Sequence, residues 1–222
     1  MAWMVKNMEL KTIIFDLDGV ICFTDEYHYL AWKAMADSIG VPFDREVNNR
    51  LRGVSRMASL DIILERSTES FSQTEKESLA NQKNELYKQY LTQITERDLS
   101  DEVRETLIAL REKWLKLAIG SSSKNTPMIL QRLGLEGFFD AVSDGNNITH
   151  SKPDPEVFVK AAQMLSMPAE NCLVVEDAVS GTEAGHRAGM KVACLGDASK
   201  AGAGEYNMAS FGELIGIAEN WK

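Results

Sequence analysis

Short apolar runs, separated by helix-length segments, recur along most of this chain. The runs fall at Thr12–Phe15, Leu115–Ile119, Leu173–Val175 and Val192–Leu195. Continuous apolar runs of this length are typical of strands buried on both faces, and their spacing indicates βαβ units. We therefore predict an α/β fold with a doubly wound (Rossmann-like) parallel sheet that is covered by helices on both faces.

Helical periodicity fills the segments between these runs. The apolar residues of one segment recur at i, i+4, i+7 and i+11, namely Val103, Leu107, Leu110 and Trp114. This spacing predicts an amphipathic helix that packs on the sheet. Asn125–Leu133 and Glu156–Met164 are expected to be two more helices, because Gly134 and Pro168 supply their C-terminal signals.

One stretch breaks the alternation of strands and helices. From about Thr24 to Thr95 the sequence has helical pattern and polar turns but no convincing strand. Apolar stripes mark a long helix (Leu79, Leu86, Tyr90, Ile94) and a first helix (Trp32, Met35, Ile39). We predict that residues 24–95 form a helical cap inserted into a Rossmann-like core made of residues 1–23 and 96–222. Such an insertion has the geometry of a hinged lid.

Composition narrows the classes of protein that fit. The 222 residues are 44% hydrophobic and 26% charged, which is typical of globular proteins and excludes disordered or collagen-like chains. Acidic residues outnumber basic ones by 33 to 24, which argues against nucleic-acid binding. No apolar run reaches the roughly 18 residues of a membrane helix, and no signal peptide is recognisable. We therefore expect a cytoplasmic protein without a membrane partner, and a monomer by default.

The cysteines and histidines carry no metal signal. Cys22, Cys172 and Cys194 are widely spaced, so we expect buried thiols in a reducing compartment. The histidines at positions 28, 150 and 186 lack the paired spacing of a zinc site, and we assign no metal to them.

Acidic residues directly follow two of the predicted strands. Asp16 and Asp18 share one side of an extended segment, and Glu176 and Asp177 end the run that begins at Leu173. On its own, the first pair is equally typical of a solvated turn. However, open parallel sheets bind ligands at their carboxyl ends, and four carboxylates gathered there would repel one another without a cation. Oxygen ligands of this kind predict a Mg²⁺ site.

Two other segments offer groups that bind anions. Gly120–Ser123 follows the second predicted strand and leads into a helix, so it presents hydroxyl and backbone N–H groups. Lys152 precedes a proline, which favours an extended loop, and its ammonium group can neutralise phosphate and carboxylate charge. Together with the acids, these groups predict a site for phosphoryl chemistry.

The order of these segments resembles that of the haloacid dehalogenase superfamily of phosphotransferases. The four motifs are FDLDGV (15–20), SSSKN (121–125), SKPDP (151–155) and VVEDAVSGTEAG (174–185), and they span nearly the whole chain. The resemblance implies that Asp16 is the nucleophile, which forms an aspartyl phosphate, and that Asp18 is the general acid and base. It implies a Mg²⁺ site made of Asp16, the backbone carbonyl of Asp18, Glu176 and Asp177. It implies that the transferring phosphate is bound by Ser121, Ser122 and Lys152.

Within that superfamily, finer features resemble the β-phosphoglucomutases. Thr24–His28 resembles their hinge, and Arg52–Arg56 resembles the cap loop that clamps the far phosphate of the substrate. The resemblance implies that this distal phosphate and the sugar are held by Gly53, Val54, Ser55, Arg56, Ser123, Lys124 and Asn125. It implies that the hinge and cap use Thr24, His28, Trp32 and Lys83. Phe23 departs from the pattern, which has an aspartate beside the hinge threonine.

The activity implied by this resemblance is a Mg²⁺-dependent interconversion of β-glucose 1-phosphate and glucose 6-phosphate. It would pass through an aspartyl phosphate and β-glucose 1,6-bisphosphate, which also serves as the activator. A sugar-phosphate phosphatase is the alternative, because it needs the same residues and differs only in letting water attack the phosphoenzyme. A non-catalytic phosphate-binding module is a third hypothesis, which the four acids and Lys152 disfavour.

Overall fold

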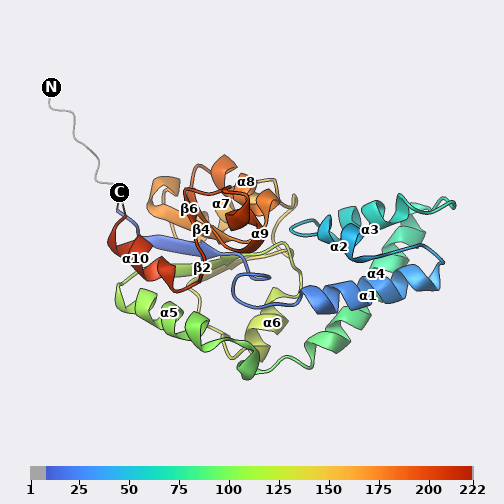
Figure 1. Ribbon diagram of the computed structural model, residues 1–222, viewed down its shortest axis with the longest axis horizontal. Coiled ribbons are helices and arrows are strands. Elements are labelled where there is room, and N and C mark those ends of the chain that lie inside the picture. The colour runs from blue at the N-terminus through green and yellow to red at the C-terminus, as the bar shows by residue number, and fades with distance from the viewer. Residues whose placement is uncertain (1–8, 222) are drawn as a thin grey trace.

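A six-stranded parallel sheet forms the centre of the molecule (Figure 1). The computed structural model describes residues 9–221. The strands are β1 (Thr12–Phe15), β2 (Lys116–Gly120), β3 (Ala141–Ser143), β4 (Cys172–Glu176), β5 (Lys191–Cys194) and β6 (Tyr206–Asn207). Their order is β3-β2-β1-β4-β5-β6, so the chain moves outward from β1 in both directions. The predicted doubly wound parallel sheet is confirmed.

The register of the central strands lines up their carboxyl ends. Phe15 of β1 pairs with Ile119 on one side and with Val175 on the other. The next residues of the three strands are therefore neighbours along one edge of the sheet. This edge, where the strand order reverses, is the place at which doubly wound sheets bind ligands.

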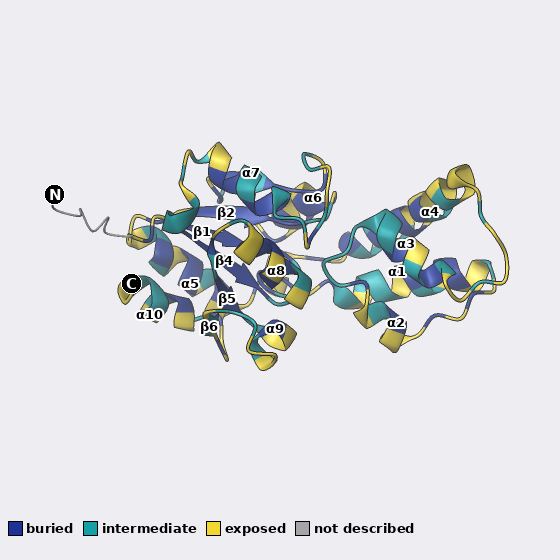
Figure 2. Cartoon of the chain, turned by 90° about the horizontal axis from the view of Figure 1, so that it is seen from above, coloured by how far each residue is buried: buried dark blue, intermediate teal, exposed yellow. Residues whose placement is uncertain are grey.

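Helices cover both faces of this sheet. They are α5 (Asp101–Glu112), α6 (Thr126–Arg132), α7 (Glu156–Met164), α8 (Val179–Arg187), α9 (Gly196–Lys200) and α10 (Glu213–Glu219), with short 3-10 turns at Glu96–Asp98 and Ala169–Asn171. Side chains of β1 alternate between the two faces, so Ile13 and Phe15 pack with α5 and α10 while Ile14 packs with α7 and α8. Figure 2 shows the buried strands between these layers. Within residues 9–221 no helix combines the length and apolar character needed to cross a membrane.

Two strands were not predicted, and one helix ends earlier than expected. β3 and β6 contain three and two residues, which is too short to show any periodicity. The helix expected to reach Trp114 ends at Glu112, and Trp114 lies at φ 63° with its side chain 93% exposed. The assignment of Trp114 to the apolar stripe was wrong, because the chain has already turned toward β2 at that point.

A cap of helices lies beyond the carboxyl edge of the sheet (Figures 1 and 2). Its elements are α1 (Asp25–Ser38), α2 (Arg45–Asn49), α3 (Arg56–Leu64) and α4 (Gln73–Leu91), and the described chain has no strand between them. The cap has its own apolar cluster, which includes Trp32, Met35 and Ile63. The predicted helical insertion is confirmed, while its exact limits at residues 24 and 95 stay a prediction.

The buried face of α4 differs from the predicted stripe. The buried residues are Ala80, Lys83, Asn84, Tyr87 and Leu91. The predicted positions Leu79, Leu86 and Tyr90 are only partly buried, and Ile94 lies beyond the helix. The predicted stripe is confirmed in part, since Leu79, Leu86 and Tyr90 pack against buried apolar clusters and Ile94 is buried. The apolar pattern missed Lys83 and Asn84, which are polar and turn inward. Elsewhere, all three cysteines are buried free thiols, as predicted.

The core predicts a clear contrast between two neighbouring residues of α5. Leu107 is 1% exposed in the main apolar cluster, whereas the Ile108 side chain is 49% exposed. We expect Leu107→Ala to lower the free energy of unfolding by about 3 kcal/mol, because it leaves a cavity. The matched control Ile108→Ala should cost less than about 1 kcal/mol. Urea denaturation followed by circular dichroism measures both, and equal losses would contradict this packing.

Candidate active site

Three carboxylates meet at the carboxyl edge of the sheet. Asp16 follows β1, while Glu176 ends β4 and Asp177 follows it. One carboxylate oxygen from each of these residues lies within 4.8 Å of the others. The parallel pairing of β1 with β4 therefore brings together acids that are separated by 160 residues in the sequence. A set of carboxylate oxygens at this spacing has the chemistry that suits a hard divalent cation such as Mg²⁺.

Lys152 lies between two of these acids. Its Nζ donates hydrogen bonds to Asp16 and to Glu176 Oε1, the latter at 2.5 Å, and its side chain is buried. Burial alone would lower the pKa of Lys152, but the charges of Asp16 and Glu176 outweigh that effect and raise it. Lys152 is therefore a permanent cation at the centre of the acidic cluster.

The remaining acidic charge is only partly compensated. Burial raises the pKa of Asp177 to about 8, and the neighbouring charges of Glu176 and Asp16 add to this effect. The pKa of Glu176 is also raised by burial, although Lys152 acts in the opposite direction. Without a metal, the cluster therefore holds protons near neutral pH, and a divalent cation would displace them.

Gly19 allows the first motif to pass close to Asp177. Its φ is +83°, a conformation that favours glycine. A Cβ atom at this position would come within 2.4 Å of both Asp177 Oδ2 and Cγ. A side chain at residue 19 would therefore displace one of the three clustered carboxylates.

The serine loop after β2 lines the neighbouring part of the site. Ser121 is buried, and its Oγ accepts a hydrogen bond from the backbone N–H of Ser123 at 3.2 Å. The hydroxyl of Ser122 is buried and has no hydrogen-bond partner within the described chain. Because buried polar atoms are rarely left unpaired, this hydroxyl fits a ligand such as a phosphate oxygen.

Asp18 lies on the cap side of Asp16. The hydroxyl of Thr24 donates to Asp18 Oδ1 and lies 2.9 Å from the Tyr87 hydroxyl of α4. Burial raises the pKa of Asp18 to about 7; Thr24 lowers it and the charge of Asp16 raises it further. A carboxyl group with this pKa can both give and accept a proton near neutral pH.

A second pair of cap side chains reaches Asp18. Lys83 Nζ of α4 lies 2.9 Å from His28 Nδ1 of α1, and His28 Nε2 lies 3.9 Å from Asp18 Oδ2. Burial and the charge of Lys83 hold the pKa of His28 well below its usual range. Burial also lowers the pKa of Lys83, whose Nζ lies 4.8 Å from the ring centre of Trp32. The His28–Lys83 pair next to Asp18 therefore comes from the cap.

A cavity of about 560 Å³ separates the core from the cap. Its wall includes every side chain that the sequence assigned to the site except Thr24, which lies behind Asp18. Arg56 and Lys124 face this cavity, and neither has an ion-pair partner in the described part of the chain. Two cations without an ion-pair partner among residues 9–221 thus line the same cavity as the acidic cluster, and they offer a second position for an anionic group.

Several wall residues were missed by the sequence analysis of motifs. They are Ser59, Asn81, Asn84, Gly145 and Thr149. Asp25 and Arg52 also line the wall, and they lie in the hinge and cap-loop segments, where the resemblance gave them no role of their own. Asn125 Nδ2 donates to Asn84 Oδ1 at 3.0 Å, and this buried pair joins the cap to the loop before α6. Asn84 follows Lys83 directly, but no local pattern distinguishes it from the other polar residues of α4.

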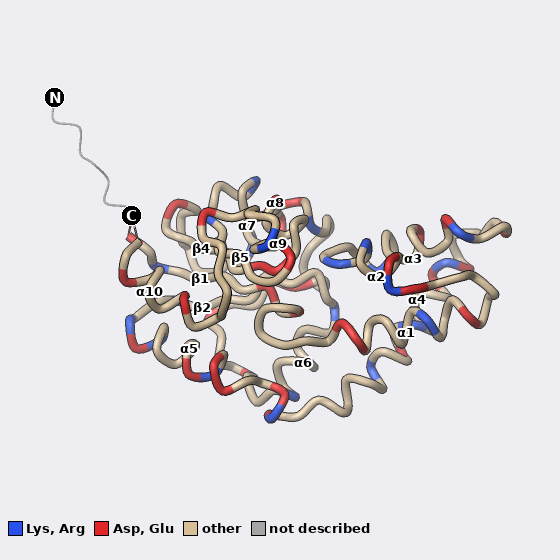
Figure 3. The backbone as a smooth tube through the Cα atoms, viewed as in Figure 1, with Lys and Arg blue, Asp and Glu red and all other residues tan. Residues whose placement is uncertain are grey.

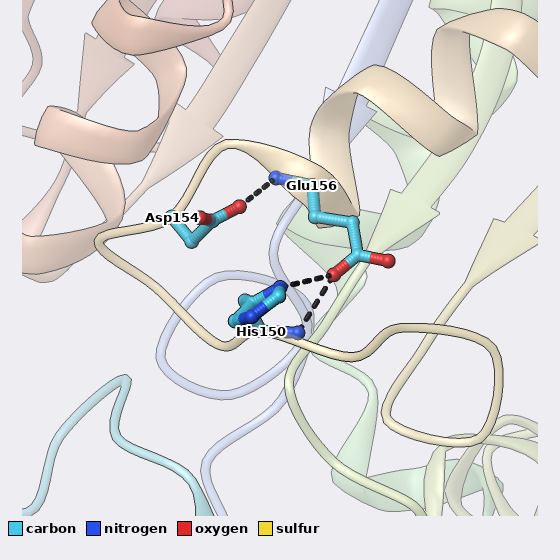
Figure 4. Close-up of side chains that lie close together, drawn as sticks. All are labelled: His150, Asp154 and Glu156. Carbon is cyan, nitrogen blue, oxygen red and sulfur yellow. Dashed lines mark hydrogen bonds and ion pairs between the residues drawn. The ribbon is translucent and has the colours of Figure 1, made fainter.

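A second group of possible metal ligands lies apart from the acidic cluster (Figure 4). Glu156 accepts hydrogen bonds from the backbone N–H groups of Thr149 and His150 and pairs with Lys160 at 2.7 Å. The bond from Lys160 and these N–H groups lower the pKa of Glu156 to about 2. Asp154 in turn accepts from the N–H of Glu156. These contacts already satisfy the carboxylates, so the cluster fastens the loop that carries Lys152.

Comparisons with known proteins agree with this site. A model of the haloacid dehalogenase-like hydrolase family matches residues 10–189. The chain is 41% identical to the β-phosphoglucomutase of Bacillus subtilis, over 82% of this chain and 81% of that protein. It is 31% identical to a phosphorylated carbohydrates phosphatase of Thermotoga maritima, over 82% and 83% of the two chains.

A solved structure extends the similarity to the whole fold. The crystal structure of β-phosphoglucomutase from Clostridium difficile has a TM-score of 0.87 and 35% identity. The match covers 92% of this chain and 93% of that one. These matches confirm the resemblance that the four motifs predicted, and they show that the chain is an enzyme of the phosphotransferase type.

The raised pKa of Asp177 predicts how stability depends on pH. Its pKa is 3.8 ordinarily and about 8 in the folded, metal-free protein, so the folded state binds more protons between these values. The free energy of unfolding should therefore fall as pH rises from about 5 to 8. Excess Mg²⁺ should flatten this decline, because the metal replaces the proton.

Thermal unfolding of the metal-free protein across this pH range measures the effect. Asp177→Asn should remove much of the slope, whereas Asp61→Asn, an exposed carboxylate on α3 paired with Lys76, should keep it. An equal slope in wild type and Asp177→Asn would show that Asp177 does not titrate in this way.

Proposed function

This chain belongs to the haloacid dehalogenase-like hydrolase family, and from that premise we propose a Mg²⁺-dependent phosphomutase that interconverts β-glucose 1-phosphate and glucose 6-phosphate. The observation that carries the proposal is the pairing of two anion-binding regions in one cavity. The acidic cluster, Lys152, Arg56 and Lys124 all line this cavity. A mutase needs both regions, because its bisphosphate intermediate carries a phosphate at each end.

The proposed reaction begins at Asp16. Its carboxylate attacks the phosphorus of a bound phosphate, forming an aspartyl phosphate and releasing the sugar oxygen. Asp18 gives its proton to that oxygen, and in the second half-reaction it accepts the proton of the hydroxyl that is to be phosphorylated. The pKa of Asp18, about 7, is suited to both tasks.

The surrounding groups bind and orient the transferring phosphate. Ser121, the orphaned hydroxyl of Ser122 and Lys152 are placed to bind its oxygens. Lys152 also fixes the carboxylate of Asp16 by a direct hydrogen bond. Mg²⁺ held by Asp16, the backbone carbonyl of Asp18, Glu176 and Asp177 would supply further positive charge at the phosphate.

The cap side of the cavity is proposed to hold the other end of the substrate. Arg56 offers a planar guanidinium that suits bidentate contact with a phosphate. Ser123, Lys124 and Asn125 approach from the core, while Gly53, Val54 and Ser55 approach from the cap loop. Thr24, His28, Trp32 and Lys83 adjust Asp18 and exclude water, which would otherwise hydrolyse the aspartyl phosphate. β-Glucose 1,6-bisphosphate would serve as intermediate and activator.

A sugar-phosphate phosphatase remains the second candidate. One relative with 31% identity is named a phosphorylated carbohydrates phosphatase. The phosphatase reaction would use the same nucleophile and acid. The unpaired cations Arg56 and Lys124 favour the mutase, because a phosphatase has less need of a second phosphate anchor.

Phosphorus NMR separates these activities. With β-glucose 1-phosphate, Mg²⁺ and a trace of the bisphosphate, we expect glucose 6-phosphate to accumulate rather than inorganic phosphate. Asp16→Asn should abolish turnover, because an amide cannot act as the nucleophile. Release of inorganic phosphate as the main product would support the phosphatase, and no turnover at all would support a binding module.

Replacing the cap arginine tests the distal site. Arg56→Gln should lower kcat/KM of the mutase reaction roughly 10- to 100-fold, because it removes charged hydrogen bonds to the distal phosphate. Arg50→Gln is the matched control, since Arg50 lies nearby in the cap but is paired with Glu65. A coupled assay for glucose 6-phosphate measures both variants, and equal kcat/KM values would argue against a distal phosphate at Arg56.

A further inference from the structure

Arg52 connects the cap to the core by two ion pairs. It lies in the loop between α2 and α3, at the mouth of the cavity. Its Nη2 lies 2.5 Å from Asp25 Oδ2 at the start of α1, and its Nη1 lies 2.9 Å from Asp197 Oδ2 in the first turn of α9. Figure 3 shows this basic loop facing acidic positions near α9. The guanidinium thus spans one carboxylate of the cap and one of the core.

The backbone of the same loop also rests on the core. Ser180 Oγ of α8 donates to the carbonyl oxygen of Arg52 at 3.4 Å. Gly53 has φ +71°, and a Cβ atom there would lie 2.5 Å from Ser180 Oγ. A glycine is therefore needed for this approach. The loop is in direct contact with the helix that follows Glu176 and Asp177.

Among the ion pairs of residues 9–221, the one between Arg52 and Asp197 joins the cap to the core. Apart from the contact between His28 and Asp18, the other recorded pairs join cap to cap or core to core. The nearby link between Asn84 and Asn125 is uncharged. If the cap moved away from the core, one ion pair between permanently charged side chains would break, namely the pair between Arg52 and Asp197.

We propose that Asp25, Arg52 and Asp197 form a reversible clasp that stabilises the closed position of the cap over the cavity. Each charged group keeps a partner when the clasp opens. Arg52 would stay with Asp25, which moves with the cap, and Asp197 would stay with Lys200 at 3.0 Å. Opening therefore leaves no unpaired charge, and the cap can release without a large penalty.

The strength of the clasp is suited to this role. The side chains of Arg52 and Asp197 are 33% and 61% exposed, so water and salt screen their attraction. Exposed ion pairs of this kind stabilise a conformation only slightly, and they change an equilibrium constant about two- to five-fold. The clasp thus biases the cap toward closure while substrate binding and product release remain able to overcome it. This inference does not depend on which phosphosugar reacts.

Distance measurement between spin labels tests the clasp without substrate. The labels are placed at Glu69→Cys, in the loop between α3 and α4, and at Gln163→Cys on α7. Both positions are exposed, and the native cysteines are buried, so labelling is selective. Double electron–electron resonance gives the ratio of closed to open distances in the otherwise wild-type protein.

Variants of the clasp should increase the open population. We expect Arg52→Gln and Asp197→Asn each to shift the closed-to-open ratio about two- to five-fold, and the double variant to shift it no further than either alone. Salt should open the parent protein and have less effect on Asp197→Asn. The matched control Glu26→Gln loses an ion pair to Arg45 within the cap, so its distances should not change.

Several outcomes would overturn the proposal. They are an unchanged distribution in both Arg52→Gln and Asp197→Asn, additive effects in the double variant, or an equal response of Glu26→Gln. Because catalysis plays no part in this readout, failure of the clasp is distinguishable from failure of the proposed mutase reaction.

Discussion

The buried ammonium of Lys152 is the interaction on which the rest of this structure depends. Parallel pairing of β1 with β4 places Asp16 and Glu176 side by side, with Asp177 next to them, in a region largely shielded from water. Buried charges are costly unless they are paired. Lys152 compensates part of the charge and hydrogen-bonds to two of the acids, so the carboxylates can remain together at the edge of the sheet. The negative charge that Lys152 leaves uncompensated makes the site suitable for a divalent cation.

The two parts of the molecule contribute different groups to one cavity. The core supplies the carboxylates and Lys152, whereas the cap supplies Arg56, Lys83 and His28. Asp18 lies between the two sets, held by Thr24 and close to His28. Its ability to exchange a proton near pH 7 therefore depends on the position of the cap. The contacts of Asp18 with Thr24 and His28 therefore connect the position of the cap with the exclusion of water and with the protonation of Asp18.

The local sequence pattern predicted those features of the fold and site that depend on residues close together in the chain. Asp16 and Glu176 could be placed at one edge because the carboxyl ends of parallel strands lie together. Lys152 was assigned to the site by its motif, not by a strand end. The buried face of α4 could not be predicted, because Lys83 and Asn84 are polar residues that turn inward toward a site formed by other segments. Trp114 continued an apolar spacing past the end of its helix, and β3 and β6 were too short to show a period. The contact of Arg52 with Asp197, 145 residues apart, leaves no local trace.

Chemical trapping of the phosphoenzyme tests the central claim most directly. The protein is incubated with β-glucose 1,6-bisphosphate and Mg²⁺, quenched, and treated with borohydride, which reduces an aspartyl phosphate to homoserine. Tandem mass spectrometry then locates the altered residue. The arrangement of Asp16 against Lys152 and the clustered acids predicts homoserine at position 16. Modification at another aspartate, or none under conditions of turnover, would contradict the account.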